Sequence, residues 1–242
     1  MHAMAGRAAA VDKPISAGWK RARRDLPGVL NTLSTAYGAS RYFPRFDPLD
    51  ELISCILSQH GADITTFPTF TRLRAAYPDW GQLAAADVED VKRVIQRAGL
   101  AGQKAKAIQA ALRHCESTFG DFTLEPLRDW STEAMVEWLR AIPGVGPKTV
   151  AIVACFALGR DLCPVDTHVE RVVKRLGWAA TTESAERVQT NLARVMPSGA
   201  AFATHNLLIQ HGRLTCQAKA PRCPECPLRS ICRWPKTERK RA

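Results

Sequence analysis

The segment Ile142-Pro143-Gly144-Val145-Gly146-Pro147-Lys148-Thr149 leads directly into the apolar run Val150–Leu158. Two glycines around one apolar residue predict a tight turn between two helices, with Val145 directed into the core. Pro147 suits the first turn of the second helix, where a missing N–H costs little. Such a turn directs amide N–H groups outward at a helix start, where the helix dipole favours an anion. The pattern therefore predicts either a phosphate-binding hairpin or an ordinary glycine-containing helical corner.

Helical periodicity continues through most of the chain from Leu26 onward. Apolar residues recur at helical spacing in the stretches 49–57, 88–95, 135–139 and 150–158. Prolines and glycines separate these stretches, and Asp87 and Ser131 are suited to cap the helices that follow them. The alternating pattern of a strand or hairpin is not seen. We therefore expect an all-α protein with two helical lobes and a groove between them.

Length and charge limit the classes of function. The chain has 242 residues and a formal net charge of +11 at pH 7, which indicates a polyanionic partner, most often a nucleic acid. A merely solvated basic surface is the alternative. The longest apolar run is about half the length that a membrane-spanning helix needs, so no membrane association is expected.

The ends of the chain differ in pattern from its middle. Residues 1–24 start with an alanine-rich stretch and end in Lys20-Arg-Ala-Arg23-Arg24, which predicts a flexible basic extension. Near the other end, basic residues surround a group of cysteines and should give this part of the molecule a positive field; they are Arg213, Lys219, Arg222, Arg229 and Arg233.

Four cysteines near the C-terminus have the spacing Cys216-x6-Cys223-x2-Cys226-x5-Cys232. Four thiolates in short loops can bind an iron–sulfur cluster, and they can also bind zinc tetrahedrally. Only one Cys-x-x-Cys unit is present, whereas zinc ribbons usually have two that are far apart, so an iron–sulfur cluster is favoured. Two disulfides are a third interpretation.

The remaining cysteines argue against disulfides. Cys55, Cys115, Cys155 and Cys163 stand singly in apolar stretches, as buried free thiols do. The N-terminus lacks the basic and apolar regions of a secretory signal, so we expect a reducing cytoplasm, with the nucleoid as the location in a bacterium.

Lys148 and Asp166 are the candidate catalytic pair. Lys148 lies just inside the predicted helix, and Val165-Asp166-Thr167-His168 follows after the apolar run could have crossed the core and returned. A lysine in a dry pocket at a helix start, opposite a carboxylate, can act as a nucleophile with an electrostatic partner. Lys148 could instead only anchor a phosphate, and Asp166 could only cap the helix that begins at Thr167. For His168 a structural hydrogen-bonding role is favoured.

These motifs together resemble the helix-hairpin-helix DNA glycosylase superfamily, specifically its iron–sulfur endonuclease III branch, from about Leu26 to Cys232. The resemblance rests on segments that occur in the family's order: Leu57-Ser58-Gln59, Gly99-Leu100, Lys104-Ala105, Pro143–Thr149, Val165–His168, Gln210-His211-Gly212-Arg213 and the four cysteines. It implies a six-helix barrel domain with the helix-hairpin-helix over 41–160. It also implies an iron–sulfur cluster domain built from both termini, 25–40 and 161–242, with DNA crossing the groove between the domains.

The implied activity is that of a monomeric, bifunctional DNA glycosylase and AP lyase of base excision repair. Such an enzyme removes oxidised pyrimidines from duplex DNA after turning the damaged nucleotide out of the stack. By this resemblance Lys148 attacks the sugar C1′ and forms a Schiff base that leads to β-elimination, while Asp166 stabilises positive charge on the sugar. A [4Fe-4S] cluster is bound by Cys216, Cys223, Cys226 and Cys232. The alternatives are a damaged-DNA-binding protein of the same fold with weak or lost activity, and an unrelated zinc-containing adaptor for nucleic acids.

The resemblance also implies contacts with DNA. Leu100 matches the apolar wedge of the family, and either Gln59 or His60 matches the residue that fills the gap left by the flipped base. The phosphate contacts are expected from the hairpin residues Gly144, Val145, Gly146 and Thr149 and from Lys219 and Arg222 near the cysteines. Pro147 departs from the family pattern and removes one N–H that could have met phosphate, so substrate range and rate are expected to differ from the family norm.

Overall fold

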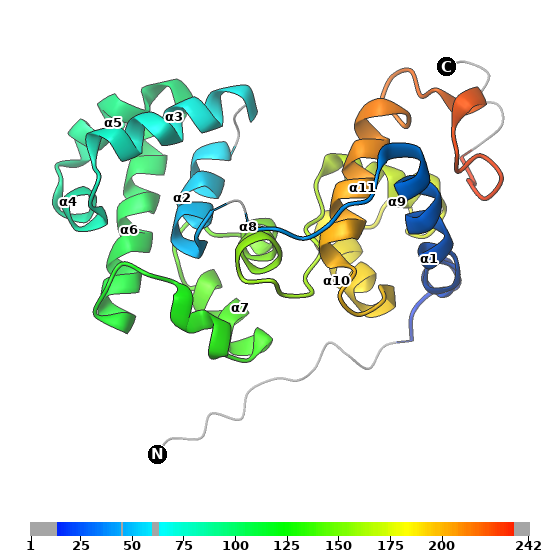
Figure 1. Ribbon diagram of the computed structural model, residues 1–242, viewed down its shortest axis with the longest axis horizontal. Helices are drawn as coiled ribbons and strands as arrows, with labels where there is room; N and C mark the ends of the chain where they lie inside the picture. The colour runs from blue at the N-terminus through cyan, green and yellow to red at the C-terminus, as the bar shows by residue number, and fades with distance from the viewer. Residues whose placement is uncertain (1–13, 45, 60–62, 235–242) are drawn as a thin grey trace. The chain divides into compact units, whose positions relative to one another are not determined.

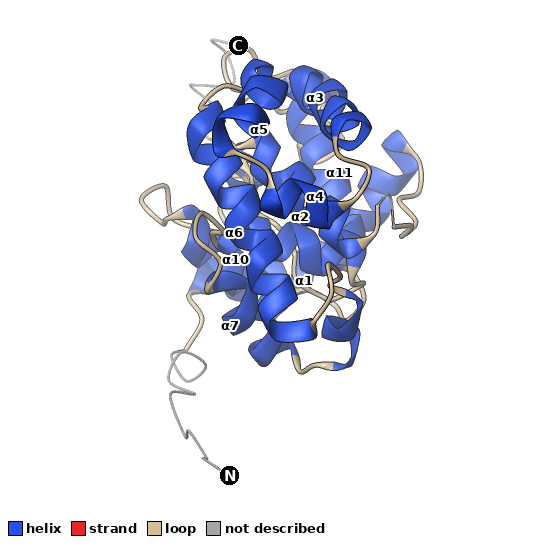
Figure 2. Cartoon of the chain, turned by 90° about the vertical axis from the view of Figure 1, so that its left-hand side faces the viewer, coloured by secondary structure: helices blue, strands red, loops and turns tan. Residues whose placement is uncertain are grey.

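The computed structural model describes residues 14–44, 46–59 and 63–234. All regular structure within these ranges is helical, and Figure 2 shows no strand in them. The all-α class predicted from the sequence is therefore confirmed. None of the helices described there combines the length and the apolar character that a bilayer-spanning helix requires.

The chain divides into two compact units. Unit 1 contains the described parts of Met1–Gly38, Thr167–Pro197 and Leu207–Ala242, and unit 2 contains Ala39–Asp166 and Ser198–Asn206. The domain boundaries expected from the sequence differ from this division, because 39–40 belong to unit 2, and so do 161–166 and 198–206. The reason is local: the Asp161 carboxylate accepts hydrogen bonds from the N–H groups of Gly199 (2.7 Å) and Ala201 (3.0 Å), which ties these segments together.

Unit 2 is organised around one buried helix. Its helices are α2 (Pro48–Ser58), α3 (Asp63–Ala76), α4 (Trp80–Ala85), α5 (Val88–Ile95), α6 (Ala101–Phe119), α7 (Thr132–Arg140) and α8 (Pro147–Ile152), with the short helices η1 (Gln96–Ala98), η2 (Glu125–Asp129) and η3 (Val153–Ala157) (Figure 1). α2 contacts α3, α6, α8 and η3, and Leu52, Ile53 and Ile56 are completely buried. Helix α2 is therefore the centre of the core of unit 2.

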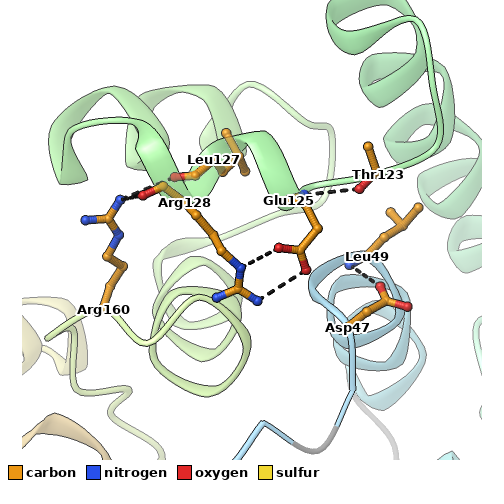
Figure 3. Close-up of polar contacts among 7 residues, drawn as sticks. All are labelled: Asp47, Leu49, Thr123, Glu125, Leu127, Arg128 and Arg160. Carbon is orange, nitrogen blue, oxygen red and sulfur yellow. Dashed lines mark hydrogen bonds and ion pairs between the residues drawn. The ribbon is translucent and has the colours of Figure 1, made fainter.

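Helix caps and one arginine order the loops of unit 2. Asp47 begins α2 by accepting a hydrogen bond from the Leu49 N–H at 2.9 Å. The Arg160 guanidinium donates to the carbonyl groups of Leu127, Arg128 and Trp130 at 3.3, 2.7 and 2.6 Å. Figure 3 shows the Arg160 contacts with Leu127 and Arg128 beside the ion pair that Arg128 makes with Glu125 within η2. Carbonyl groups at the end of η2 thus receive donors from a residue distant in the sequence.

Unit 1 contains α1 (Ala17–Tyr37), α9 (Thr167–Arg175), α10 (Ala185–Val195) and η4 (Cys223–Glu225), and α11 (Ala201–Leu214) contributes to both units. The Gly212 position in α11 has no room for a side chain, since an added Cβ would lie 2.9 Å from the His168 Cβ. Glycine at this position therefore permits the close packing of α11 on α9 within unit 1.

The expected flexible extension over 1–24 is wrong for its second half. Helix α1 starts at Ala17, where the Ser16 side chain caps it by accepting from the Trp19 N–H. Trp19, Ala22 and Leu26 are buried at helical spacing. Lys20, Arg23 and Arg24 are exposed on the outer side of this helix, while Arg21 is half-buried and donates to the Gly177 carbonyl. Residues 1–13 lie outside the described ranges.

Candidate active site and cysteine pocket

The glycine-rich segment forms the turn between α7 and α8. Gly144 has φ +83°, a conformation that residues with a side chain rarely adopt. Val145 is only 6% exposed, and its N–H donates to the Ile142 carbonyl at 3.1 Å. Gly146 lies at the N-cap of α8, with its carbonyl accepting from the Val150 N–H. The tight turn and the inward position of Val145 agree with the sequence-based prediction.

Lys148 is the second residue of α8, directly after Pro147. Its side chain is exposed, so unit 2 does not by itself form the dry pocket that the sequence predicts. The next two residues of the same turn, Thr149 and Val150, are buried.

Asp166 also belongs to unit 2, at the end of the segment that returns from η3. It follows the buried Val165, immediately precedes α9, and is half-buried. A half-buried carboxylate keeps its charge less screened by water than an exposed one does. Asp166 is thus suited to an electrostatic role.

Gln59 joins the end of α2 to the hairpin turn. Its side-chain amide donates to the Gly144 carbonyl at 2.9 Å and to Thr149 Oγ1 at 3.4 Å. The Thr149 side chain is buried, so its hydroxyl faces the protein interior beneath the turn. The other gap-filling candidate, His60, lies outside the described residues.

Leu100 occupies an unusual backbone position before α6. It has φ +49° and ψ +34°, which makes it the one non-glycine residue with positive φ among the described residues. Its side chain is 52% exposed. A left-handed backbone at a leucine costs about 1–3 kcal/mol and has to be held by its surroundings. The loop thus presents a large apolar side chain to the outside at a cost in stability.

Lys104 is a buried lysine whose position in a family motif was its only role in the sequence-based predictions. Its side chain is 3% exposed, and Nζ donates to the carbonyl groups of Leu57 and Ala98, both at 2.7 Å. Burial lowers the pKa of Lys104. The available signal was its spacing, because Lys104 lies four residues before the core residue Ile108 on the same helix face.

The four C-terminal cysteines line one pocket in unit 1. All eight cysteines of the chain are free, so the disulfide interpretation is not supported. Burial is the main cause that raises the pKa of the Cys226 thiol to about 11, and the other three cysteines of the pocket act in the same direction. Among the described residues, no group of three or more histidine, cysteine or acidic side chains is arranged to hold a single metal ion.

Two arginines of α9 hold the chain on one side of this pocket. Arg175 donates to the carbonyl groups of Gln217 (2.7 Å) and Ala218 (3.0 Å), and its Nη1 lies 3.4 Å from Cys216 Sγ. Arg171 donates to the Cys216 carbonyl at 2.9 Å. Neither residue was predicted from the sequence. Their four-residue spacing on an amphipathic helix was the available signal.

A hydrogen-bonded chain of side chains lines the pocket on another side. The Tyr37 hydroxyl lies 2.9 Å from His211 Nδ1 and 2.7 Å from Thr215 Oγ1, and His211 Nε2 lies 3.8 Å from Cys226 Sγ. Burial lowers the pKa of His211 to about 4, so its ring is neutral at pH 7. The pocket thus offers thiols and neutral or cationic donors.

Lys219 and Arg222 lie on the loop that leaves this pocket. Both are exposed. The Arg222 N–H donates to the Thr215 carbonyl at 2.8 Å, which closes the loop on itself. Two positive side chains thus extend from a loop whose backbone is fixed at both ends.

Known proteins are similar to this chain in sequence and in fold. Residues 53–198 match the family described as HhH-GPD superfamily base excision DNA repair protein. The endonuclease III of Bacillus subtilis (strain 168) is 35% identical over 187 residues, which cover 77% of this chain and 81% of that protein. A putative DNA glycosylase of Arabidopsis thaliana is 34% identical over 171 residues, which cover 71% of this chain and 58% of that protein. This chain therefore spans less than two thirds of the plant relative.

A solved structure of a trapped covalent intermediate between endonuclease III and DNA has a TM-score of 0.76 and 29% identity. The match covers 89% of this chain and 98% of that one. The chain therefore belongs to the HhH-GPD superfamily of base excision DNA repair proteins. Within that class it is a member of the endonuclease III family of DNA glycosylases with AP lyase activity, as the sequence predicted.

Proposed function

We propose that this enzyme removes oxidised pyrimidines from duplex DNA and cleaves the strand through a Schiff base on Lys148. The observation that carries the proposal is the exposed amino group of Lys148 in the first turn of α8, directly after the glycine turn. The relative trapped on DNA as a covalent intermediate supports it. A nucleophile that must reach a sugar from outside has to be accessible in the free protein.

The chemistry then follows from the two candidate residues. The neutral amine of Lys148 attacks C1′ of the extruded nucleotide, the bond to the base breaks, and the base leaves with the electron pair and a proton. Opening of the sugar ring gives a protonated Schiff base between C1′ and Nζ. This electron sink permits loss of a C2′ proton and departure of the 3′ phosphate. Asp166 stabilises the positive charge that develops on the sugar.

The loops of unit 2 supply the extrusion step. Leu100, exposed on its strained backbone, is the proposed wedge that enters the base stack. The Gln59 side chain is hydrogen-bonded to the Gly144 carbonyl of the hairpin turn. We therefore assign the gap-filling role to His60. The amide groups of the turn at Gly144 and Gly146, backed by Val145 and Thr149 in the core, are the proposed phosphate contacts.

In unit 1 we propose that the four pocket cysteines hold a [4Fe-4S] cluster. The single pocket, the free thiols and the nearby Arg175 guanidinium fit four thiolates that carry negative charge. When bound, the cluster would stabilise the fold of the loop that carries Lys219 and Arg222, which would contact DNA phosphates. The proposed cellular location is the cytoplasm, with the enzyme acting as a monomer on DNA.

Replacing Lys148 with Gln should abolish the covalent adduct with DNA. The purified protein, duplex DNA with one thymine glycol or one abasic site, and borohydride should give an adduct on both substrates, because borohydride reduces the Schiff base. The Lys148→Gln variant should give none, while Lys106→Gln should behave as the wild type. An undiminished adduct in Lys148→Gln would assign the nucleophile elsewhere, and no adduct with wild type would favour a DNA-binding protein without lyase chemistry.

The Asp166→Asn variant should excise the base about 10²–10³-fold more slowly, since it removes a charge placed at a developing cation. Single-turnover excision measures this effect. Because Asp166 also precedes α9, the melting temperature of the variant must be compared. A slow variant with unchanged melting temperature supports the electrostatic role, whereas a fully active variant with a lowered melting temperature would show that Asp166 is only a helix cap.

Charge removal on the loop of unit 1 should weaken DNA binding in a salt-dependent way. Each of Lys219→Ala and Arg222→Ala should reduce the slope of log affinity against log salt by about 1 and should do so for any DNA sequence. Titrations of duplex DNA at several salt concentrations provide the slope. Arg113→Ala, which removes an exposed charge from α6 in unit 2, is the control. An equal change in all three variants would argue against a specific phosphate contact.

Iron and sulfide analysis should find about four of each per chain in anaerobically purified protein, together with broad visible absorption. Cys226→Ser should lose most of both, because it removes one of the four ligands. Cys115→Ala, a buried cysteine of unit 2, should keep them. Stoichiometric zinc in place of iron would reject the cluster.

A further inference from the structure

Lys104 connects two chain segments that the proposed function places near the DNA. The Leu57 carbonyl that accepts from Nζ is in the last turn of α2, two residues before Gln59. The Ala98 carbonyl closes η1, two residues before Leu100. One buried amino group therefore bridges the end of α2 and the chain segment that leads to Leu100.

The connection extends to the hairpin turn. Gln59, at the C-cap of α2, donates from its side chain to the Gly144 carbonyl at 2.9 Å. A continuous path thus runs from the Leu100 loop through Lys104 to the end of α2, and from there through Gln59 to the turn that precedes Lys148. The two Lys104 contacts and the Gln59 contact are hydrogen bonds of ordinary length from a side-chain donor to a backbone carbonyl.

Ordinary packing does not explain a lysine at this position. Leu57 and Ala98 are themselves buried, at 1% and 3% exposure, so their carbonyl groups need a donor from the protein. Both lie at the C-terminal ends of helical segments, where the peptide dipoles favour a cation. The same site faces a loop whose Leu100 backbone is strained and must be held in place.

We propose that Lys104 is a positioning residue that sets the placement of the Leu100 wedge relative to the end of α2 and the hairpin turn. The proposal rests on the proposed function for its catalytic consequence. It does not place Lys104 at the reacting atoms. Lys104 acts through Leu100, and its loss misplaces the wedge, a kind of error that can cost up to about a hundredfold in rate.

A double-mutant cycle with Leu100 tests this link. Lys104→Met keeps the length of the side chain and removes its donors, and Lys106→Met, on the exposed side of the same helix, is the matched control. We expect Lys104→Met to slow single-turnover excision of thymine glycol by about tenfold and cleavage at a preformed abasic site by less. In a Leu100→Ala background it should slow excision by less than about twofold. Equal factors in both backgrounds would overturn the proposal.

Hydrogen exchange of the DNA-free protein gives a test that does not depend on activity. The Gln59 and Gly99 N–H groups donate to the Ile56 and Gln96 carbonyls, and Lys104→Met should speed exchange in the peptides that contain them. Lys106→Met should leave their exchange unchanged. Uniformly faster exchange throughout unit 2, or no change, would overturn the proposal.

These two arms separate the failure of the proposal from failure of the proposed function. A wild-type protein without excision activity would reject the function, while the exchange result would still decide the role of Lys104. If Lys104→Met does not fold, Lys104→Gln, which retains one donor group, is measured in both arms. If neither variant folds, Lys104 supports the whole of unit 2 and the positioning role is rejected.

Discussion

Burial of α2 on all of its faces is the constraint on which the arrangement of unit 2 depends. Helices α3, α6 and α8 pack around it, and nearly all of its side chains are excluded from water. A helix that is surrounded in this way has to end where its last carbonyl groups find donors within the protein. Lys104 supplies one of these donors. The end of α2 therefore lies beside the segments that carry Leu100 and Lys148.

The same requirement orders the cysteine pocket of unit 1 by different means. There the described chain after α11 contains only one short helix, η4, so its backbone makes few regular hydrogen bonds. Arg175 and Arg171 provide donors to the carbonyl groups of 216–218. A guanidinium group offers several donors in one plane and keeps its charge when buried, so one arginine can replace several backbone partners. Both units thus place long cationic side chains in the interior to hold irregular segments.

Several features followed directly from local sequence. The glycine turn, the caps at Asp87 and Ser131 and the buried Val145 were predicted because each depends on residues within a few positions of one another. The extension over 1–24 was predicted wrongly, because basic residues in a row looked like a solvated tail. Trp19 and Ala22 are buried against helices distant in the sequence, and this packing makes the segment an ordered helix.

By itself, the sequence determined the helical class, the hairpin around Gly144, the candidate nucleophile Lys148 and the set of four cysteines, since spacing and residue type carry these features. Only the tertiary structure decided that Gln59 binds the hairpin turn, that Leu100 has a left-handed backbone and that Lys104 is buried between Leu57 and Ala98. The physical reason is that every residue has a backbone carbonyl, so the type of the accepting residue does not indicate such a hydrogen bond. Its partner becomes visible only when the chain is folded.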